Sequence, residues 1–129
     1  MSRRFYISGF LFGLIAIILG AFATHGLKPL LSVEAMVSFE TGVKYQIYHS
    51  LLLIVLGNIK ELALNSLKWV YYFLMGGIIL FSGSIYLLAT NALTGFDFTK
   101  IALLTPLGGS LLILAWALLL FKFITLKNK

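Results

Sequence analysis

Long apolar segments alternate with short polar ones along the 129-residue chain. Four of the apolar segments are long enough to cross a bilayer, because a spanning helix needs about 20 mostly apolar residues. They are Phe5–Thr24, Gly42–Ile59, Trp69–Thr90 and Lys100–Ile124. The pattern therefore predicts an all-α integral membrane protein with four transmembrane helices, folded as a single domain over residues 1–129.

The start of the fourth segment admits two interpretations. Thr105 and Pro106 could form a helix N-cap followed by proline at the first helical position, which is a favourable pairing. Alternatively, a helix from about Thr99 is kinked or broken at Pro106. We favour the second interpretation, because Ile101–Leu104 is too apolar to lie in water.

A short amphipathic segment lies between the first two apolar segments. Ser32 can cap a helix running to Phe39, and Glu34 in its first turn suits the helix dipole. Pro29 and Gly42 are its natural boundaries. Three apolar residues share one face, namely Val33, Met36 and Val37. The pattern predicts a separate interfacial helix over residues 32–39, lying on the outer membrane surface.

Composition excludes two broad classes, soluble globular and disordered proteins. Hydrophobic residues make up 60% of the chain and charged residues only 11%, whereas ordinary soluble domains carry about 25% charge. With no cysteine, the chain has neither a disulfide nor a thiolate metal site. The net charge of +6 is spread singly or in pairs beside apolar segments, without the basic stripe of a nucleic-acid-binding protein. The expected partner is therefore the lipid bilayer and not nucleic acid.

The distribution of basic residues predicts the orientation, because Lys and Arg concentrate in cytoplasmic loops. Seven fall on one side of the four segments and three on the other. We therefore expect both termini in the cytoplasm and the loop Gly26–Thr41 outside. The cytoplasmic set is Arg3, Arg4, Lys60, Lys68, Lys122, Lys127 and Lys129, and the outer set is Lys28, Lys44 and Lys100.

The N-terminal segment also imitates a secretory signal. Arg3 and Arg4 precede an apolar run, and Ala21-Phe22-Ala23 matches an A-x-A cleavage site. The run is longer than the usual apolar core of such signals, which has about 7–15 residues. We therefore expect it to be retained as a transmembrane helix.

A polar run occupies the entry of the second apolar segment. Helical spacing gives two rows, Glu40, Lys44 and Tyr48 in one and Thr41, Tyr45 and His49 in the other. The candidate polar cluster comprises His25, Glu40, Thr41, Lys44, Tyr45, Gln46, Tyr48 and His49. Buried polar groups in membrane bundles usually join helices, so we favour interhelical ties over a ligand or proton site. Lone histidines are weak evidence for ligation, and we expect no metal and no cofactor.

Two further sets of residues recur at helical spacing. Polar atoms interrupt the later segments at Ser82, Ser84, Tyr86 and Thr105, where bonds to a helix backbone or a neighbouring helix are expected. Small residues that let helices approach closely are Gly9, Gly13, Ala16, Gly20, Gly76, Gly83 and Gly108. We expect these faces to pack the four helices together, with homo-oligomerisation as the alternative.

Catalytic motifs are missing from the sequence. It contains no phosphate-binding loop, nucleophile elbow or metalloprotease motif, and its four acidic residues leave little for acid–base chemistry. We therefore expect no enzymatic activity. The leading hypothesis is a component that binds a larger membrane complex or copies of itself. The alternatives are an oligomeric transporter or channel for ions or small solutes, and a lipid- or quinone-binding site in the outer leaflet.

Four blocks in order carry a family resemblance. They are Gly20–Leu27, Phe39–Leu51, Leu80–Tyr86 and Thr105–Gly109, the last followed by Trp116. The chain resembles the YgdD/YwdK-like family of small bacterial membrane proteins (domain of unknown function 423), which is related to eukaryotic transmembrane protein 256. The resemblance covers nearly the whole chain, with Thr24 as a departure from the usual small residue. It implies a four-helix protein of the bacterial inner membrane and carries no activity or catalytic residues to transfer.

Overall fold

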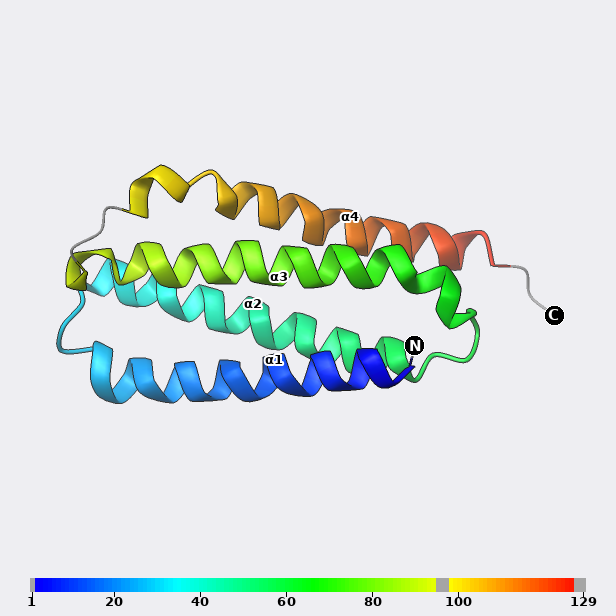
Figure 1. Cartoon of the computed structure of the whole chain (residues 1–129), viewed down its shortest axis with the longest axis horizontal. Coiled ribbons are helices and arrows are strands. Elements are labelled where there is room, and N and C mark those ends of the chain that lie inside the picture. The colour runs from blue at the N-terminus through cyan, green and yellow to red at the C-terminus, as the bar shows by residue number, and fades with distance from the viewer. Residues whose placement is uncertain (1, 95–97, 127–129) are drawn as a thin grey trace.

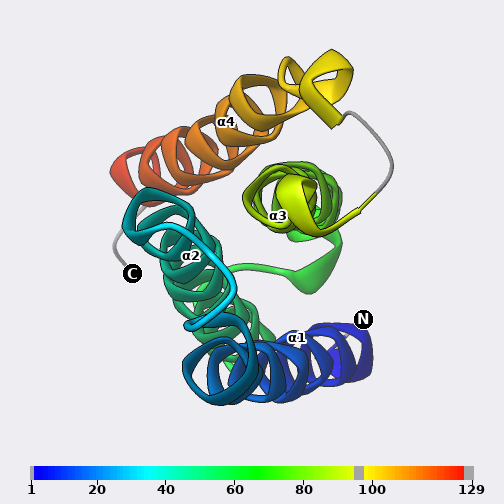
Figure 2. The same ribbon diagram turned by 90° about the vertical axis from the view of Figure 1, so that its left-hand side faces the viewer.

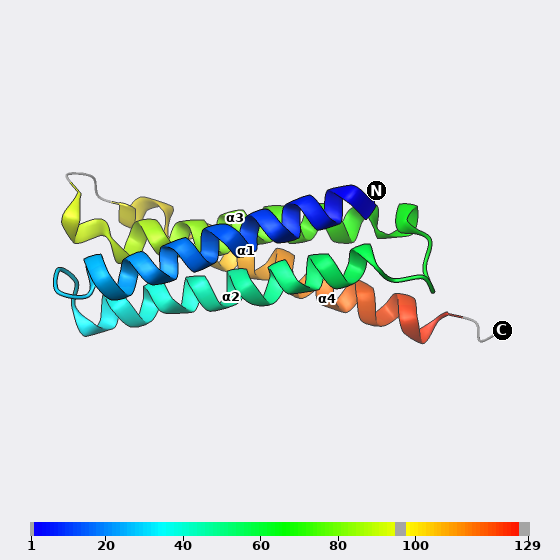
Figure 3. The same cartoon turned by 90° about the horizontal axis from the view of Figure 1, so that it is seen from below.

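The computed structural model describes residues 2–94 and 98–126, and the regular elements in these ranges are all helices. Four long helices, α1 (Ser2–Phe22), α2 (Val33–Gly57), α3 (Lys68–Ala89) and α4 (Leu104–Ile124), run antiparallel to their neighbours in the chain (Figure 1). α1 begins and α4 ends at the same end of the bundle, as Figure 3 also shows. Lys127 and Lys129, which entered the predicted orientation, lie outside the described residues.

The helices pack in chain order rather than as a closed ring. α2 and α3 lie in the centre, with α1 packed on α2 and α4 packed on α3 (Figure 2). Two apolar clusters fill the interior, one that includes Phe5, Leu53 and Leu74 and one that includes Ala16, Phe39 and Ala89. Buried polar side chains on α2 and α3 lie between these clusters, so the core has a polar layer across its middle.

The exterior of the bundle is apolar. Three helical stretches among the described residues are long and apolar enough to cross a membrane: Ser2–Leu27, Asn65–Ala89 and Leu104–Ile124. Large apolar side chains such as Phe10 and Leu120 are more than 60% exposed, which suits a surface covered by lipid rather than water. α2 is less apolar than the other three helices, because it carries Glu34, Glu40 and Lys44.

α2 is one continuous helix, so the prediction of a separate interfacial helix over residues 32–39 was wrong. Ser32 does cap the helix, accepting the Ala35 N–H at 3.1 Å, but the helix then runs 25 residues without a break. Gly42 was expected to end the short helix and instead lies where a methyl group would meet the Tyr86 ring at 2.8 Å. Close packing against α3 therefore explains this glycine, and no turn is needed there.

The fourth segment is broken, but the break precedes Leu104 and is not at Pro106, where the favoured interpretation placed it. A 3₁₀ helix covers Phe98–Ile101, and α4 begins separately at Leu104. The alternative, in which Thr105 is the N-cap, is wrong because Leu103 occupies that position without a side-chain cap. Pro106 lies in the first turn of α4, where a missing N–H costs no helical hydrogen bond. The first segment also extends beyond α1, through a π-helical turn over Ala23–Leu27.

Candidate functional site

α2 divides the polar run between two environments. Gln46 and His49 point into the bundle and are buried. Glu40, Lys44, Tyr45 and Tyr48 are exposed on the outer surface of α2. Thr41 lies between these groups and donates a hydrogen bond to the Val37 carbonyl of its own helix at 2.9 Å. The polar run therefore contributes to two surfaces of α2. The inner surface contacts other helices, and the outer surface is exposed outside the bundle.

Gln46 joins three helices through one side chain. Its Nε2 donates to the Phe12 carbonyl of α1 at 2.8 Å, and its Oε1 accepts from the Tyr86 hydroxyl of α3 at 2.6 Å. Both ends of the amide are thus occupied in the bundle interior, where an unpaired amide would cost free energy. The structure thus brings together Gln46 and Tyr86, both predicted from the sequence, as an interhelical tie.

His49 is held in one tautomer by its two neighbours. Trp116 Nε1 on α4 is 3.0 Å from His49 Nε2, and an indole N–H can only donate, so Nε2 must accept. The proton therefore lies on Nδ1, which is 2.6 Å from the Tyr45 carbonyl and donates to it. With both ring nitrogens engaged, His49 would have to lose a hydrogen bond before it could bind a metal ion.

Serine and threonine hydroxyls make two further ties between α3 and its neighbours. Ser82 donates to the Gly42 carbonyl of α2 at 2.8 Å. Ser84 and Thr105 share a hydrogen bond of 2.5 Å between their hydroxyl oxygens, which joins α3 to α4. All four secondary polar residues predicted from the sequence, Ser82, Ser84, Tyr86 and Thr105, therefore contact another helix.

The small residues predicted at helix faces differ in how closely they pack. A methyl group at Gly9 would lie 2.6 Å from Ile54 of α2, and one at Gly108 would lie 2.8 Å from the Leu80 backbone of α3. Gly13, Gly20 and Gly76 leave an ordinary contact of 3.4–3.5 Å, and Ala16 is fully buried. Gly83 has nothing within 4 Å of such a methyl group. Among the small residues predicted to pack helices, Gly9 and Gly108 therefore allow the closest approach, and Gly83 takes no part in it.

His25 does not join the other members of the predicted cluster. It is exposed in the turn Ala23–Leu27, and its side chain makes no hydrogen bond to any other described residue. Within residues 2–94 and 98–126, no group of three or more His, Cys, Asp or Glu side chains could hold a metal ion.

The exposed row of α2 has unsatisfied polar groups. Glu40 and Lys44 are one helical turn apart, and Tyr48 follows one turn later. Among the described residues, neither the two charged groups nor the Tyr48 hydroxyl has a hydrogen-bond or ion-pair partner. The Tyr48 ring contacts Tyr45, with 5.8 Å between ring centroids. We refer to Glu40, Lys44 and Tyr48 as the outer row.

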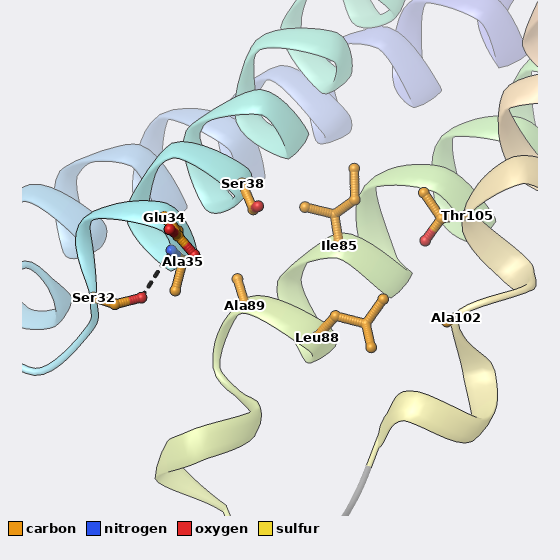
Figure 4. A pocket seen from close by; sticks show the side chains of 9 residues that line it. All are labelled: Ser32, Glu34, Ala35, Ser38, Ile85, Leu88, Ala89, Ala102 and Thr105. Atoms are coloured by element: carbon orange, nitrogen blue, oxygen red, sulfur yellow. Dashed lines mark hydrogen bonds between the residues drawn. The ribbon is translucent and has the colours of Figure 1, made fainter.

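A cavity of about 470 Å³ opens between α2, α3 and the start of α4. Figure 4 shows Ser38 on α2 and Thr105 on α4 at opposite sides, with Ile85 and Leu88 of α3 between them. Its other lining residues are Ser32, Glu34, Ala35, Ala89 and Ala102. One wall is therefore polar and the facing wall apolar. We call this the end cavity.

Sequence reasoning missed several interhelical contacts, two of which join one side chain to another. Trp116 was noted only within a family motif, although it is the partner of His49. Ser8 and Tyr71 share a buried hydrogen bond of 2.6 Å between α1 and α3. A serine inside an apolar segment signals that some partner exists, but its identity depends on which helix faces it.

Known proteins similar to this chain share its membrane character. The sequence profile described as "Protein of unknown function (DUF423)" matches residues 19–109. The UPF0382 membrane protein of Staphylococcus haemolyticus is 37% identical, covering 95% of this chain and 98% of its own length. YwdK of Bacillus subtilis is 33% identical, with coverages of 91% and 93%.

The inner membrane protein YgdD of Escherichia coli is 36% identical, covering all of this chain and 96% of its own length. No solved structure matches the chain. None of the relatives described here carries the name of an enzyme. The matches confirm the resemblance drawn from the four sequence blocks. The chain belongs to the DUF423 family of membrane proteins, whose function is unknown.

Proposed function

We propose that this protein is a non-enzymatic component of the bacterial cytoplasmic membrane that associates with a second copy of itself through the outer row. In this proposal α2 crosses the membrane as well as the three more apolar helices, which gives four transmembrane helices. Both termini are then cytoplasmic. The basic residues support that orientation, because more of them flank the end where α1 begins and α4 ends. The engagement of Gln46 and His49 in interhelical bonds supports a structural role for the inner surface.

Two hydrogen bonds allow the depth of the outer row to be estimated. Thr105, at the start of α4, is bonded to Ser84, and Ser82 nearby is bonded to Gly42. The 21 residues of α4 match a hydrocarbon core of about 30 Å, so its start marks the outer boundary. Glu40 then lies close to that boundary, and Lys44 lies about 6 Å further in.

The unpaired outer row carries the proposal. A charged side chain facing lipid below the boundary is unfavourable, and such residues usually face a partner or a water-filled space. Lys44 can reach toward the headgroups, but the Tyr48 hydroxyl is a further turn inward and also lacks a partner among the described residues. A protein surface placed against this row would satisfy all three groups.

A second copy is complementary to the outer row. In a dimer with its two-fold axis along the membrane normal, the α2 helices lie side by side in the same direction. Glu40 of each copy is then offset by about 6 Å along the axis from Lys44 of the other, a distance that two flexible side chains span. Because of the two-fold symmetry, the ion pair between Glu40 of one copy and Lys44 of the other occurs twice in the dimer.

Charge reversal tests the proposal. Glu40→Lys and Lys44→Glu should each abolish the dimer in nanodiscs, measured by native mass spectrometry. Mixing the two variants should restore dimers, all of them containing one copy of each, because only the mixed pair has opposite charges at both contacts. An ion pair within one copy would give no such rescue.

Glu61→Lys is the matched control, since Glu61 is exposed in the loop after α2 and should leave the dimer intact. A wild-type protein that is strictly monomeric would contradict the proposal. So would a foreign subunit bound at constant stoichiometry.

A further inference from the structure

We propose that the end cavity binds a primary ammonium group attached to an apolar chain, as in the phospholipid phosphatidylethanolamine. The cavity of about 470 Å³ is within the range of small-ligand sites, roughly 300–1,000 Å³. This site is separate from the outer row, and the inference does not depend on self-association.

The polar wall offers acceptors that nothing in the described chain uses. Glu34 and Ser38 are one turn apart on α2, and both line the cavity. Both side chains are exposed, and neither has a hydrogen-bond partner among the described residues. The other eight serines of the chain each make a side-chain hydrogen bond, which sets Ser38 apart. An ammonium group has three donors and no acceptor, which suits a carboxylate beside a hydroxyl.

The sign of charge in the cavity favours a cation. Among the residues that the structure describes around the cavity, Glu34 is the one ionisable side chain. The N-terminal ends of α2 and α4 and the C-terminal end of α3 border the cavity. Their partial charges, about half a unit each, sum to about +0.5, which is smaller than the full negative charge of the Glu34 carboxylate. The Ser32 hydroxyl already accepts the Ala35 N–H, so the start of α2 is capped without an anion. The Glu34 carboxylate therefore makes the net charge of the cavity negative.

The opposite wall suits an apolar chain. Ile85, Leu88 and Ala89 of α3 and Ala102 before α4 supply apolar surface facing the polar residues of α2 (Figure 4). Thr105 belongs to the same cavity and lies at the start of α4. The cavity is thus at the level where lipid headgroups meet the hydrocarbon core. An amphiphile with its ammonium on Glu34 and its chain directed along α3 satisfies both walls.

Lipid retention tests the proposal. Protein released from nanodiscs of equal phosphatidylethanolamine and phosphatidylglycerol should retain the first lipid about fivefold over the second in native mass spectra, the preference expected of a water-accessible ion pair. Glu34→Gln should reduce this ratio to about one, and Ser38→Ala should lower it in part. Ala102→Trp fills the cavity without changing its charge and should also abolish the preference.

Octylamine, titrated against the same variants in detergent, separates the two sources of the ammonium group. Binding of octylamine that is lost in Glu34→Gln, without lipid enrichment, supports a soluble amine as the ligand. Glu61→Gln is the control and should behave as wild type, and far-UV circular dichroism verifies that every variant is folded. The proposal is overturned if neither probe distinguishes wild type from Glu34→Gln, or if the lipid preference survives Ala102→Trp.

Discussion

Gly108 sets the distance between α3 and α4, and replacing it with alanine should destabilise the protein. The added methyl group would lie 2.8 Å from the Leu80 carbonyl carbon and closer still to the Phe81 backbone nitrogen. Ordinary contact begins at 3.4 Å, so the helices must separate by at least about 0.6 Å. Both clashing groups are backbone, and no side-chain rotation relieves them.

The magnitude follows from two opposing effects. Overpacking costs about 1–3 kcal/mol, and the loss of the adjacent Ser84–Thr105 hydrogen bond adds about 0.6 kcal/mol. Replacing glycine by alanine in a helix returns about 0.5–1 kcal/mol. We therefore expect Gly108→Ala to lower the free energy of unfolding by about 1–3 kcal/mol.

Gly83→Ala provides a matched control on α3. The same methyl group would meet nothing within 4 Å there, so only the helix-propensity gain of about 0.5–1 kcal/mol applies. Unfolding with sodium dodecyl sulfate in mixed micelles, followed by far-UV circular dichroism, measures both variants. The reasoning is refuted if Gly83→Ala is as destabilising as Gly108→Ala, or if Gly108→Ala is as stable as wild type.

Three other predictions concern polar groups and topology. Gln46→Leu should lower the free energy of unfolding by about 1–2 kcal/mol, because it removes two interhelical hydrogen bonds. Trp116→Phe should cost about 0.6 kcal/mol in wild type and nothing in a His49→Ala background, as a double-mutant cycle would record. The chain has no cysteine, so Ser32→Cys should react with an impermeant maleimide in intact cells and Glu61→Cys only after lysis; the reverse result would invert the orientation.

The sequence predicted which residues are helical more reliably than it predicted where each helix ends. Residues 32–39 form a helix, as the Ser32 cap predicted, but Gly42 was wrongly taken as its boundary. A glycine signals either a break or a close contact, and only the Tyr86 ring beside it decides between them. Gly83 was wrongly grouped with the packing glycines for the same reason, since periodicity does not reveal which face meets a neighbour.

The sequence by itself determined that this is a helical membrane protein, because the length and apolarity of a segment are local properties that a bilayer selects directly. Only the tertiary structure decided the partners of the polar groups. Gln46 meets Tyr86 and His49 meets Trp116 because of how each helix is rotated and shifted against its neighbours. That rotation minimises a free energy summed over all four helices, so no single segment encodes it. The same packing leaves Glu34 and Ser38 unpaired in a cavity, which neither residue indicates alone.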